Sequence, residues 1–211
     1  MLEDDADDEP EVRSALQALR NEYRADATAS VIANPLFGYE PEWSEISFCS
    51  KPFKQWTCKL FYGDSKQASD WAGDNFTNYT SSNRPDATWG NAFQHSLWVA
   101  LMSKSASTKD ALDFGMAHEA PYKGSSDRMI RLRTVMDIWN NRKGANYYLR
   151  WGTDNNEHGV CSILYNQSAY AQHIGYHNAR RFGKKTVLKY IWVRGIGGHG
   201  KNVLRRGSNQ C

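Results

Sequence analysis

The sequence lacks any apolar run long enough to cross a membrane. A transmembrane helix takes about 18 or more consecutive apolar residues, and no segment of the 211-residue chain approaches that length. The chain also opens on an acidic run, Met1 to Asp5, without the apolar stretch of a signal peptide. We therefore expect no transmembrane segment. The 40% of hydrophobic and 13% of aromatic residues are enough for a sizeable buried core.

Several common catalytic and binding motifs are missing too. No C-x-x-C pair is present, which argues against a zinc ribbon or a thioredoxin-type site. Neither G-x-S-x-G nor H-E-x-x-H is present, which argues against a common serine hydrolase and against a zinc protease of the H-E-x-x-H type. The glycine-rich segment 195–200 is no dinucleotide fingerprint, because no strand, turn and helix surround it.

Cysteine is scarce, but its count is even. The four cysteines are Cys49, Cys58, Cys161 and Cys211, which fits two disulfides, with reduced thiols as the alternative. Cys49 and Cys58 can staple a short loop, and Cys161 and Cys211 can tie the tail to the body. In the chain-entropy model, a link that closes roughly 50 residues stabilises by about 4 kcal/mol. Two disulfides favour a secreted, extracellular protein.

Acidic residues are absent from the last part of the chain. Residues 180–211 hold nine Lys and Arg and no Asp or Glu, whereas residues 1–45 hold twelve Asp and Glu against three Arg. A basic segment with interleaved aromatic residues can meet an anionic partner, either a membrane surface or a nucleic acid; the alternative is a solvated tail. The candidate binding residues are Lys184, Lys185, Lys189, Trp192, Arg194, Arg205 and Arg206.

Apolar residues recur mostly at helical spacing. Ser107 or Thr108 is a suitable helix cap, Pro121 is expected to end that helix, and a later helix is expected to break near Gly144. One short strand is predicted over residues 186–193, which are rich in β-branched and aromatic residues. The predicted helices cover residues 11–28, 64–77, 89–104, 108–120, 128–150 and 160–182.

These elements predict a mainly α fold. It would be a helical bundle-like core with disulfide-stapled loops and a short strand or irregular C-terminal tail. We divide the chain into three parts: an acidic N-terminal segment with an amphipathic helix (1–42), a helical core domain (43–150), and a C-terminal helix with a basic tail packed on the core (151–211). No oligomeric state follows from the sequence.

Polar residues recur on three neighbouring predicted helices. His95 stands in the middle of the first, His118 and Glu119 near the end of the second, and Asp137, Asn140 and Asn141 on one face of the third. If these helices pack together, the six residues would converge on one site. That set could do general acid–base chemistry without a cofactor, or bind a divalent metal through nitrogen and oxygen. The alternative is a hydrogen-bonded network that only ties the helices together.

The same residues stand in three blocks, Asn91 to Met102, Ala117 to Glu119 and Met136 to Ala145. The blocks resemble those of an uncharacterised helical domain family of bacterial secreted proteins and toxin C-terminal regions, which read D-A-F-R-H-A-x-W-N-A-L-M, A-H-E and M-D-L-x-N-N-x-x-G-R. The resemblance covers about residues 43–150 and includes an upstream Trp and two cysteines, as from Trp43 to Cys58 here. It implies a helical fold and export, but no particular reaction.

The first block departs from the family pattern at three positions. Asn91, Gln94 and Val99 stand where the family has Asp, Arg and Asn. A divalent ion would lose its expected carboxylate on this helix, whereas a site built on His118, Glu119 and Asp137 would survive. A second metal candidate, the i, i+4 pair His173 and His177, lacks a third ligand.

Two functional hypotheses follow from these residues. In the first, the protein is a secreted, toxin-like or effector-like hydrolase of a phosphodiester or lipid. Glu119 or His118 would be its general base, His95 and Asp137 would orient water or substrate, and Asn140 and Asn141 would hold a polar intermediate. In the second, it is a non-catalytic secreted binding or structural protein that retains the helical fold with a degraded site.

Overall fold

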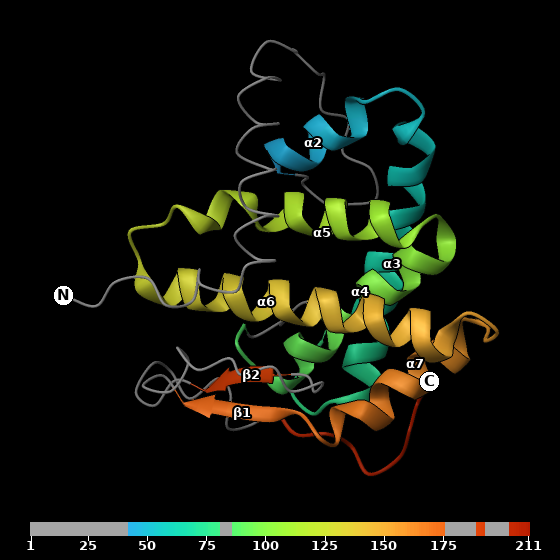
Figure 1. Cartoon of the computed structure of the whole chain (residues 1–211). Coiled ribbons are helices and arrows are strands. Elements are labelled where there is room, and N and C mark those ends of the chain that lie inside the picture. Colours follow the sequence, from blue (N-terminus) through green and yellow to red (C-terminus); the bar gives the residue numbers. More distant parts are fainter. Residues whose placement is uncertain (1–41, 81–85, 176–188, 193–202) are drawn as a thin grey trace.

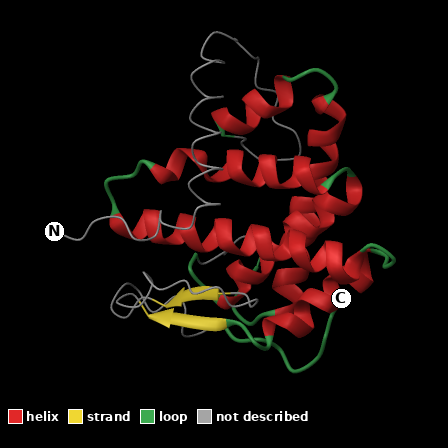
Figure 2. Ribbon diagram, viewed as in Figure 1, coloured by secondary structure: helices red, strands yellow, loops and turns green. Residues whose placement is uncertain are grey.

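The structure is a computed structural model that describes residues 42–80, 86–175, 189–192 and 203–211. The predicted helix over 11–28 and the basic residues Lys184, Lys185 and Arg194 lie outside the described residues. Within the described ranges, Figure 2 shows a mainly helical fold with two short strands, which confirms the predicted fold class.

The elements follow one another in the order that Figure 1 labels. A short π-helical turn, η2 (Tyr148–Gly152), continues the fifth described α-helix, and the two strands pair in parallel, with Gln172 opposite Lys189. The α-helices in the described residues are α2 (Trp43–Ser50), α3 (Lys54–Asn75), α4 (Trp89–Ser105), α5 (Thr108–Lys123), α6 (Arg128–Tyr147) and α7 (Glu157–Ser168), and the strands are β1 (Gln172–Gly175) and β2 (Lys189–Trp192).

Helix α4 forms the centre of the molecule. Thirteen of its 17 residues are buried, as expected for a helix that is surrounded on all sides. Helices α3, α5, α6 and α7 all pack against it. Two indole groups tie it to its neighbours, because Trp98 donates to the Phe61 carbonyl of α3 and Trp89 donates to the Ser168 carbonyl of α7.

Helices α4 and α6 lie in close backbone contact at Gly144. A Cβ atom at this position would lie only 1.9 Å from the backbone oxygen of Ser96. The predicted break near Gly144 is wrong, since α6 runs unbroken from Arg128 to Tyr147. Glycine is needed here because it has no side chain and lets the two helix backbones pack closely. Its low helix propensity alone suggested a helix break instead.

We predict that Gly144→Ala destabilises the fold by more than about 2 kcal/mol, because the added methyl group meets backbone atoms that cannot move aside. Gly63→Ala is the matched control. Gly63 lies inside α3 with no atom within 4 Å of an added Cβ, so this change should stabilise by about 0.5–1 kcal/mol through helix propensity. Urea unfolding of both variants measures the difference, and equal effects would contradict the close approach.

Both predicted disulfides are present. Cys49–Cys58 joins α2 to α3 with a Cα–Cα distance of 5.8 Å, and Cys161–Cys211 joins α7 to the last residue with a distance of 5.6 Å. Backbone hydrogen bonds hold the same tail on α3 and the residues after it, from Arg206 to Asn75 and from Thr77 to Leu204. The described part of the tail therefore lies against the core.

The ends of two predicted helices are wrong, and the helix predicted over 64–77 begins ten residues earlier, at Lys54. Helix α5 passes through Pro121 and ends at Lys123. Proline has no N–H to donate to the carbonyl four residues earlier, and here the hydroxyl group of Ser44 on α2 donates to that carbonyl, at Ala117. A contact between distant segments thus supplies the missing hydrogen bond.

Helix α7 ends at Ser168 instead of continuing to residue 182. Residues 172–175 form β1, whose partner β2 lies within the predicted strand at 186–193. His173 is therefore in a strand. The prediction that His173 and His177 face one another on a helix is wrong for His173. Residue 177 lies outside the described residues.

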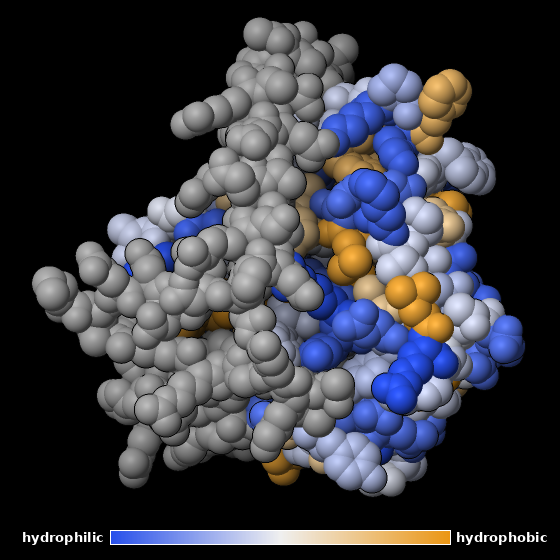
Figure 3. Space-filling view, in the orientation of Figure 1, coloured by the Kyte–Doolittle hydropathy of each residue, from blue (hydrophilic) through white to orange (hydrophobic). Residues whose placement is uncertain are grey.

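Among the described helices, none is long and apolar enough to span a membrane. On the face seen in Figure 3, hydrophobic residues form separate small patches among hydrophilic ones. Single exposed apolar residues are normal on a protein surface. Among all described large apolar side chains, the most exposed is that of Phe53, between α2 and α3, at 94%.

Asp64, on α3, is a buried carboxylate outside the three helices that carry the predicted site residues. One of its oxygens accepts a hydrogen bond from Ser105, and the other is buried with no hydrogen-bond partner among the described residues. Burial raises the pKa of Asp64 to about 7, opposed by the Ser105 hydrogen bond and assisted by the charge of Glu157. In the unfolded chain the group ionises near pH 4.

This pKa predicts a stability change between pH 4 and 7. In that window the unfolded chain has lost the Asp64 proton and the folded protein retains it, so stability falls as pH rises, by up to about 4 kcal/mol in total. Asp64→Asn should remove this part of the pH dependence and stabilise the protein at pH 8. Asp74→Asn, on the exposed face of the same helix, is the control. Parallel pH profiles for wild type and Asp64→Asn would refute the prediction.

Candidate functional site

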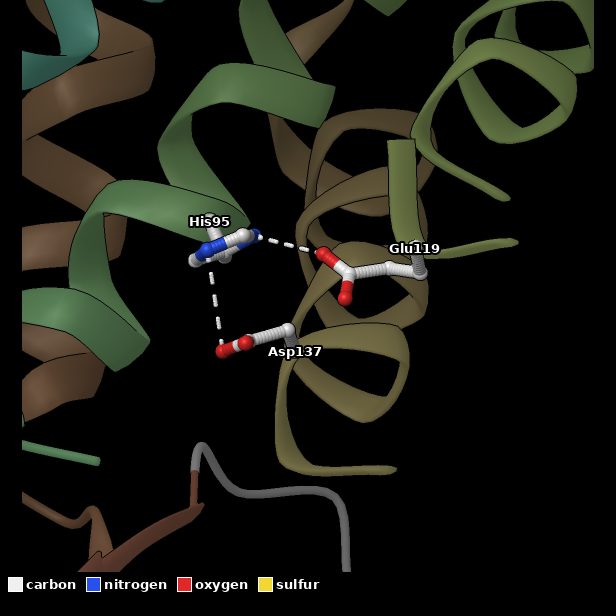
Figure 4. A group of neighbouring side chains, drawn as sticks. All are labelled: His95, Glu119 and Asp137. Carbon is white, nitrogen blue, oxygen red and sulfur yellow. Dashed lines mark ion pairs between the residues drawn. The ribbon is translucent and has the colours of Figure 1, made fainter. Parts of the chain in front are cut away.

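Three helices each contribute one side chain to a buried cluster. His95 comes from α4, Glu119 from α5 and Asp137 from α6, and one nitrogen and two carboxylate oxygens lie within 4.8 Å of one another. Figure 4 shows the three side chains pointing toward a common centre. The arrangement exists because α4, α5 and α6 pack against one another in pairs. We call these three residues the central cluster.

The two carboxylates lie at different edges of one imidazole ring. Nδ1 of His95 is 3.8 Å from Oε1 of Glu119, and Nε2 is 3.6 Å from Oδ1 of Asp137. Both distances exceed those of a hydrogen bond. Nδ1 is closer, at 3.3 Å, to the amide oxygen of Asn141 on α6. The ring therefore has one hydrogen-bond partner and two carboxylates just out of hydrogen-bonding reach.

Burial dominates the electrostatics of the cluster. Burial and the charge of His118 lower the pKa of His95 to about 3, despite the Asn141 contact. Burial raises the pKa of Glu119 to about 7, opposed by His118. Burial, together with the charges of Glu119 and Asp86, raises the pKa of Asp137 well above its ordinary value. At neutral pH the imidazole is therefore uncharged.

His118 lies beside the central cluster and pairs with Glu45 on α2. Its Nδ1 is 3.0 Å from Oε1 of Glu45, and its ring packs edge-on against Trp98 with ring centroids 5.0 Å apart. Burial lowers the pKa of His118, but the Glu45 hydrogen bond and the charges of Glu119, Glu45 and Glu42 outweigh it, so the net pKa is raised. The ring of His95 is 6.0 Å away.

Glu45 is the functional-site neighbour that the sequence analysis missed. It is fully buried, and its second oxygen accepts a hydrogen bond from the Glu42 backbone at 2.7 Å. The pattern of Glu42 followed three residues later by Glu45 was an available signal, since it matches the spacing of a capping box. That spacing predicts a helix start but no partner on α5, which is 73 residues away.

Asn140 and Asn141 are both buried in α6. Asn141 faces His95 with its amide oxygen, while its amide nitrogen is buried without a hydrogen-bond partner among the described residues. Gly115 on α5 leaves room for this amide group, because an added Cβ would lie 3.2 Å from its nitrogen. Of the six predicted site residues, the structure thus brings His95, Glu119, Asp137 and Asn141 together, with His118 at the margin.

The three positions that depart from the family pattern have structural partners. Asn91 accepts a hydrogen bond from the Ala87 backbone with its side chain. Gln94 accepts one from the Tyr79 hydroxyl group, and Val99 lies next to Gly115. None of the three belongs to the central cluster, so their replacement leaves its nitrogen and oxygen atoms intact.

The predicted basic binding residues are described only in part. Lys189 and Trp192 begin and end β2. The Arg205 guanidinium group stacks on the Tyr165 ring, 3.8 Å from its centroid. Arg206 is exposed. Arg205 therefore packs on the core, and the remaining three lie outside the described residues.

We predict strong coupling between Glu45 and His118. Glu45→Gln or His118→Gln alone should cost about 2–4 kcal/mol, because the first removes the charge that faces the partly buried His118 and the second removes the partner of the fully buried Glu45. The double variant should lose less than the sum, by at least about 1 kcal/mol in urea unfolding. The exposed pair Lys66 and Asp70 on α3 is the control, with coupling below about 0.5 kcal/mol. Additive losses at Glu45 and His118 would disprove the pairing.

The fold and the site define a disulfide-bonded, mainly helical domain with a histidine–carboxylate cluster at the meeting point of three helices. The family model of a domain of unknown function (DUF6973) matches residues 47–172, more than half of the chain, and the protein belongs to this family. This confirms the expected membership of an uncharacterised domain family. The relation to bacterial secreted proteins and toxins stays a prediction. No curated protein and no solved structure matches the chain.

Proposed function

We propose that the protein is a hydrolase of the exported toxin or effector type, and that the central cluster is its active site. One observation carries the proposal: two carboxylates flank a buried imidazole from separate helices, and neither forms a hydrogen bond with it. A network that only holds helices together satisfies its buried polar atoms. Here Oδ1 of Asp137 and Nδ2 of Asn141 are buried without hydrogen-bond partners among the described residues.

Glu119 is best suited to be the general base. Its pKa of about 7 lies near neutral pH, where a base is both available and strong enough to take a proton from water. His118 fits that role less well, because Glu45 holds its Nδ1 atom and raises its pKa. This narrows the choice between Glu119 and His118 that the sequence left open.

The reaction we propose is hydrolysis of a phosphodiester. Glu119 takes a proton from water as the water oxygen bonds to phosphorus, the ester P–O bond breaks, and the proton passes on to the leaving oxygen. The unpartnered amide N–H of Asn141 is suited to donate to an oxygen on which negative charge develops. His95 and Asp137 would orient the water and the substrate.

A phosphodiester also suits the charges of the C-terminal region. Residues 180–211 hold nine Lys and Arg without an acidic residue, and such a segment attracts phosphate groups of a lipid surface or a nucleic acid. Two disulfides are typical of proteins made for an oxidising compartment, which supports export. Substrate and export together favour a protein that acts outside the cell that makes it.

A second function has its own supporting observation. Asn91, Gln94 and Val99 replace three polar family residues on α4 and are used in the fold. A member that has lost a catalytic function would show such replacements. The second candidate is therefore a non-catalytic secreted protein that binds the same anionic partner.

The test is a hydrolysis assay with the disulfide-bonded full chain on phospholipid vesicles, DNA, RNA and peptidoglycan. We expect cleavage of one phosphodiester substrate, and a loss of at least about 100-fold in Glu119→Gln and in His95→Gln. Asp64→Asn is the control, a buried carboxylate on α3 outside the cluster, and should keep wild-type activity. Cleavage that survives Glu119→Gln would refute the site. Binding to a phosphodiester without cleavage would favour the second candidate.

A further inference from the structure

We propose that the central cluster binds a divalent cation of the zinc class through Nε2 of His95, one oxygen of Glu119 and Oδ1 of Asp137. The proposal rests on the proposed function in that it concerns the same site, but cation binding is measured without any substrate.

The contact with Asn141 determines which ring nitrogen is free. The amide oxygen of Asn141 is an acceptor, so Nδ1 of His95, 3.3 Å away, carries the hydrogen. A neutral imidazole then has its lone pair on Nε2. That lone pair lies 3.6 Å from Oδ1 of Asp137, an atom with no hydrogen-bond partner among the described residues. Two buried acceptors thus face one another, and a cation between them would satisfy both.

The charge balance points the same way. Glu119 and Asp137 are 3% and 9% exposed, and two carboxylates at such depth need a compensating charge. Arg133 acts on Asp137, and His118 and Lys123 act on Glu119, through their charges. Arg133 also pairs with Asp86 at 3.2 Å, and His118 pairs with Glu45. One divalent ion would balance the two carboxylates of the central cluster.

The ligand set suits zinc or a similar transition metal. Imidazole nitrogen with carboxylate oxygen is a common donor set for such ions, whereas magnesium and calcium prefer oxygen alone. Bonds of about 2.0–2.2 Å place neighbouring tetrahedral ligand atoms about 3.3–3.6 Å apart, close to the 3.6 Å between Nε2 and Oδ1 of Asp137. A carboxylate oxygen of Glu119 lies within 4.8 Å of one ring nitrogen and of the Asp137 carboxylate, and its Oε1 is 3.8 Å from Nδ1 of the same ring.

Three protein ligands leave one coordination position for water. This arrangement is typical of catalytic rather than structural zinc sites, and a bound cation makes water easier to deprotonate. The second oxygen of Glu119 would remain free to take that proton, as the proposed function requires. The carboxylate that the family pattern places at position 91 is not needed, because α5 and α6 supply both carboxylates.

The experiment is calorimetric titration of the folded, disulfide-bonded full chain with Zn²⁺ after treatment with a chelator, with Mn²⁺ and Mg²⁺ in parallel. We expect one Zn²⁺ per chain at micromolar affinity or tighter, weaker Mg²⁺ binding, and a higher melting temperature with Zn²⁺. His95→Gln and Asp137→Asn should each weaken Zn²⁺ binding by at least about 100-fold. Asp137→Asn preserves the shape of the side chain, His95→Gln keeps a polar side chain of similar length, and circular dichroism checks that both variants fold.

Two control variants make the result specific. His158→Ala removes an exposed histidine on α7, and Asp64→Asn removes a buried carboxylate on α3; both should bind Zn²⁺ as wild type does. The proposal fails if Zn²⁺ does not bind, if Mg²⁺ binds as tightly, or if binding survives His95→Gln. Zinc binding without hydrolysis would support this inference and refute only the hydrolase. Hydrolysis that persists in a chelator, without zinc binding, would do the reverse.

Discussion

The contact between the backbones of α4 and α6 at Ser96 and Gly144 is the constraint on which the site depends. A side chain at position 144 would overlap the carbonyl of Ser96, so only glycine lets the helices come this close. Asp137 and Asn141 lie seven and three residues before Gly144, on the same face of α6. The close approach at one end of this face therefore brings both side chains against His95, the residue before Ser96. The spacing N-N-x-x-G is thus a packing requirement as well as a motif.

Around this contact the protein separates its charges into two groups. Glu45 and His118 form a close pair that joins α2 to α5, and the Ser44 hydroxyl group joins the same two helices at the Ala117 carbonyl. The central cluster next to it has a neutral ring and two carboxylates without such a partner. Glu45 and His118 are paired and stabilise the fold, whereas the central cluster keeps a carboxylate oxygen without a hydrogen-bond partner among the described residues. We therefore place the proposed function in the central cluster.

Helical periodicity and capping residues predict the helices of the core. The core helices α4, α5 and α6 begin where expected, and the three-helix origin of the candidate site follows from them. What the sequence could not show are contacts between distant residues. Pro121 stays in a helix because Ser44 donates to the carbonyl that proline leaves free, and α7 stops because β1 has a partner in β2. Glu45 was missed for the same reason, since nothing near it in the chain indicates a histidine on α5.

Asn91, Gln94 and Val99, which replace polar residues of the family pattern on α4, are not part of the central cluster. Asn91 and Gln94 satisfy their own polar atoms within the fold, as expected where selection has acted on stability alone. Asp137 and Asn141 differ, because each keeps a buried polar atom that no described residue satisfies, and each such atom costs about 1–3 kcal/mol. Stability alone would favour apolar residues of similar shape at these positions. A fold that retains this cost beside the Gly144 contact is what the proposed ion or substrate site predicts.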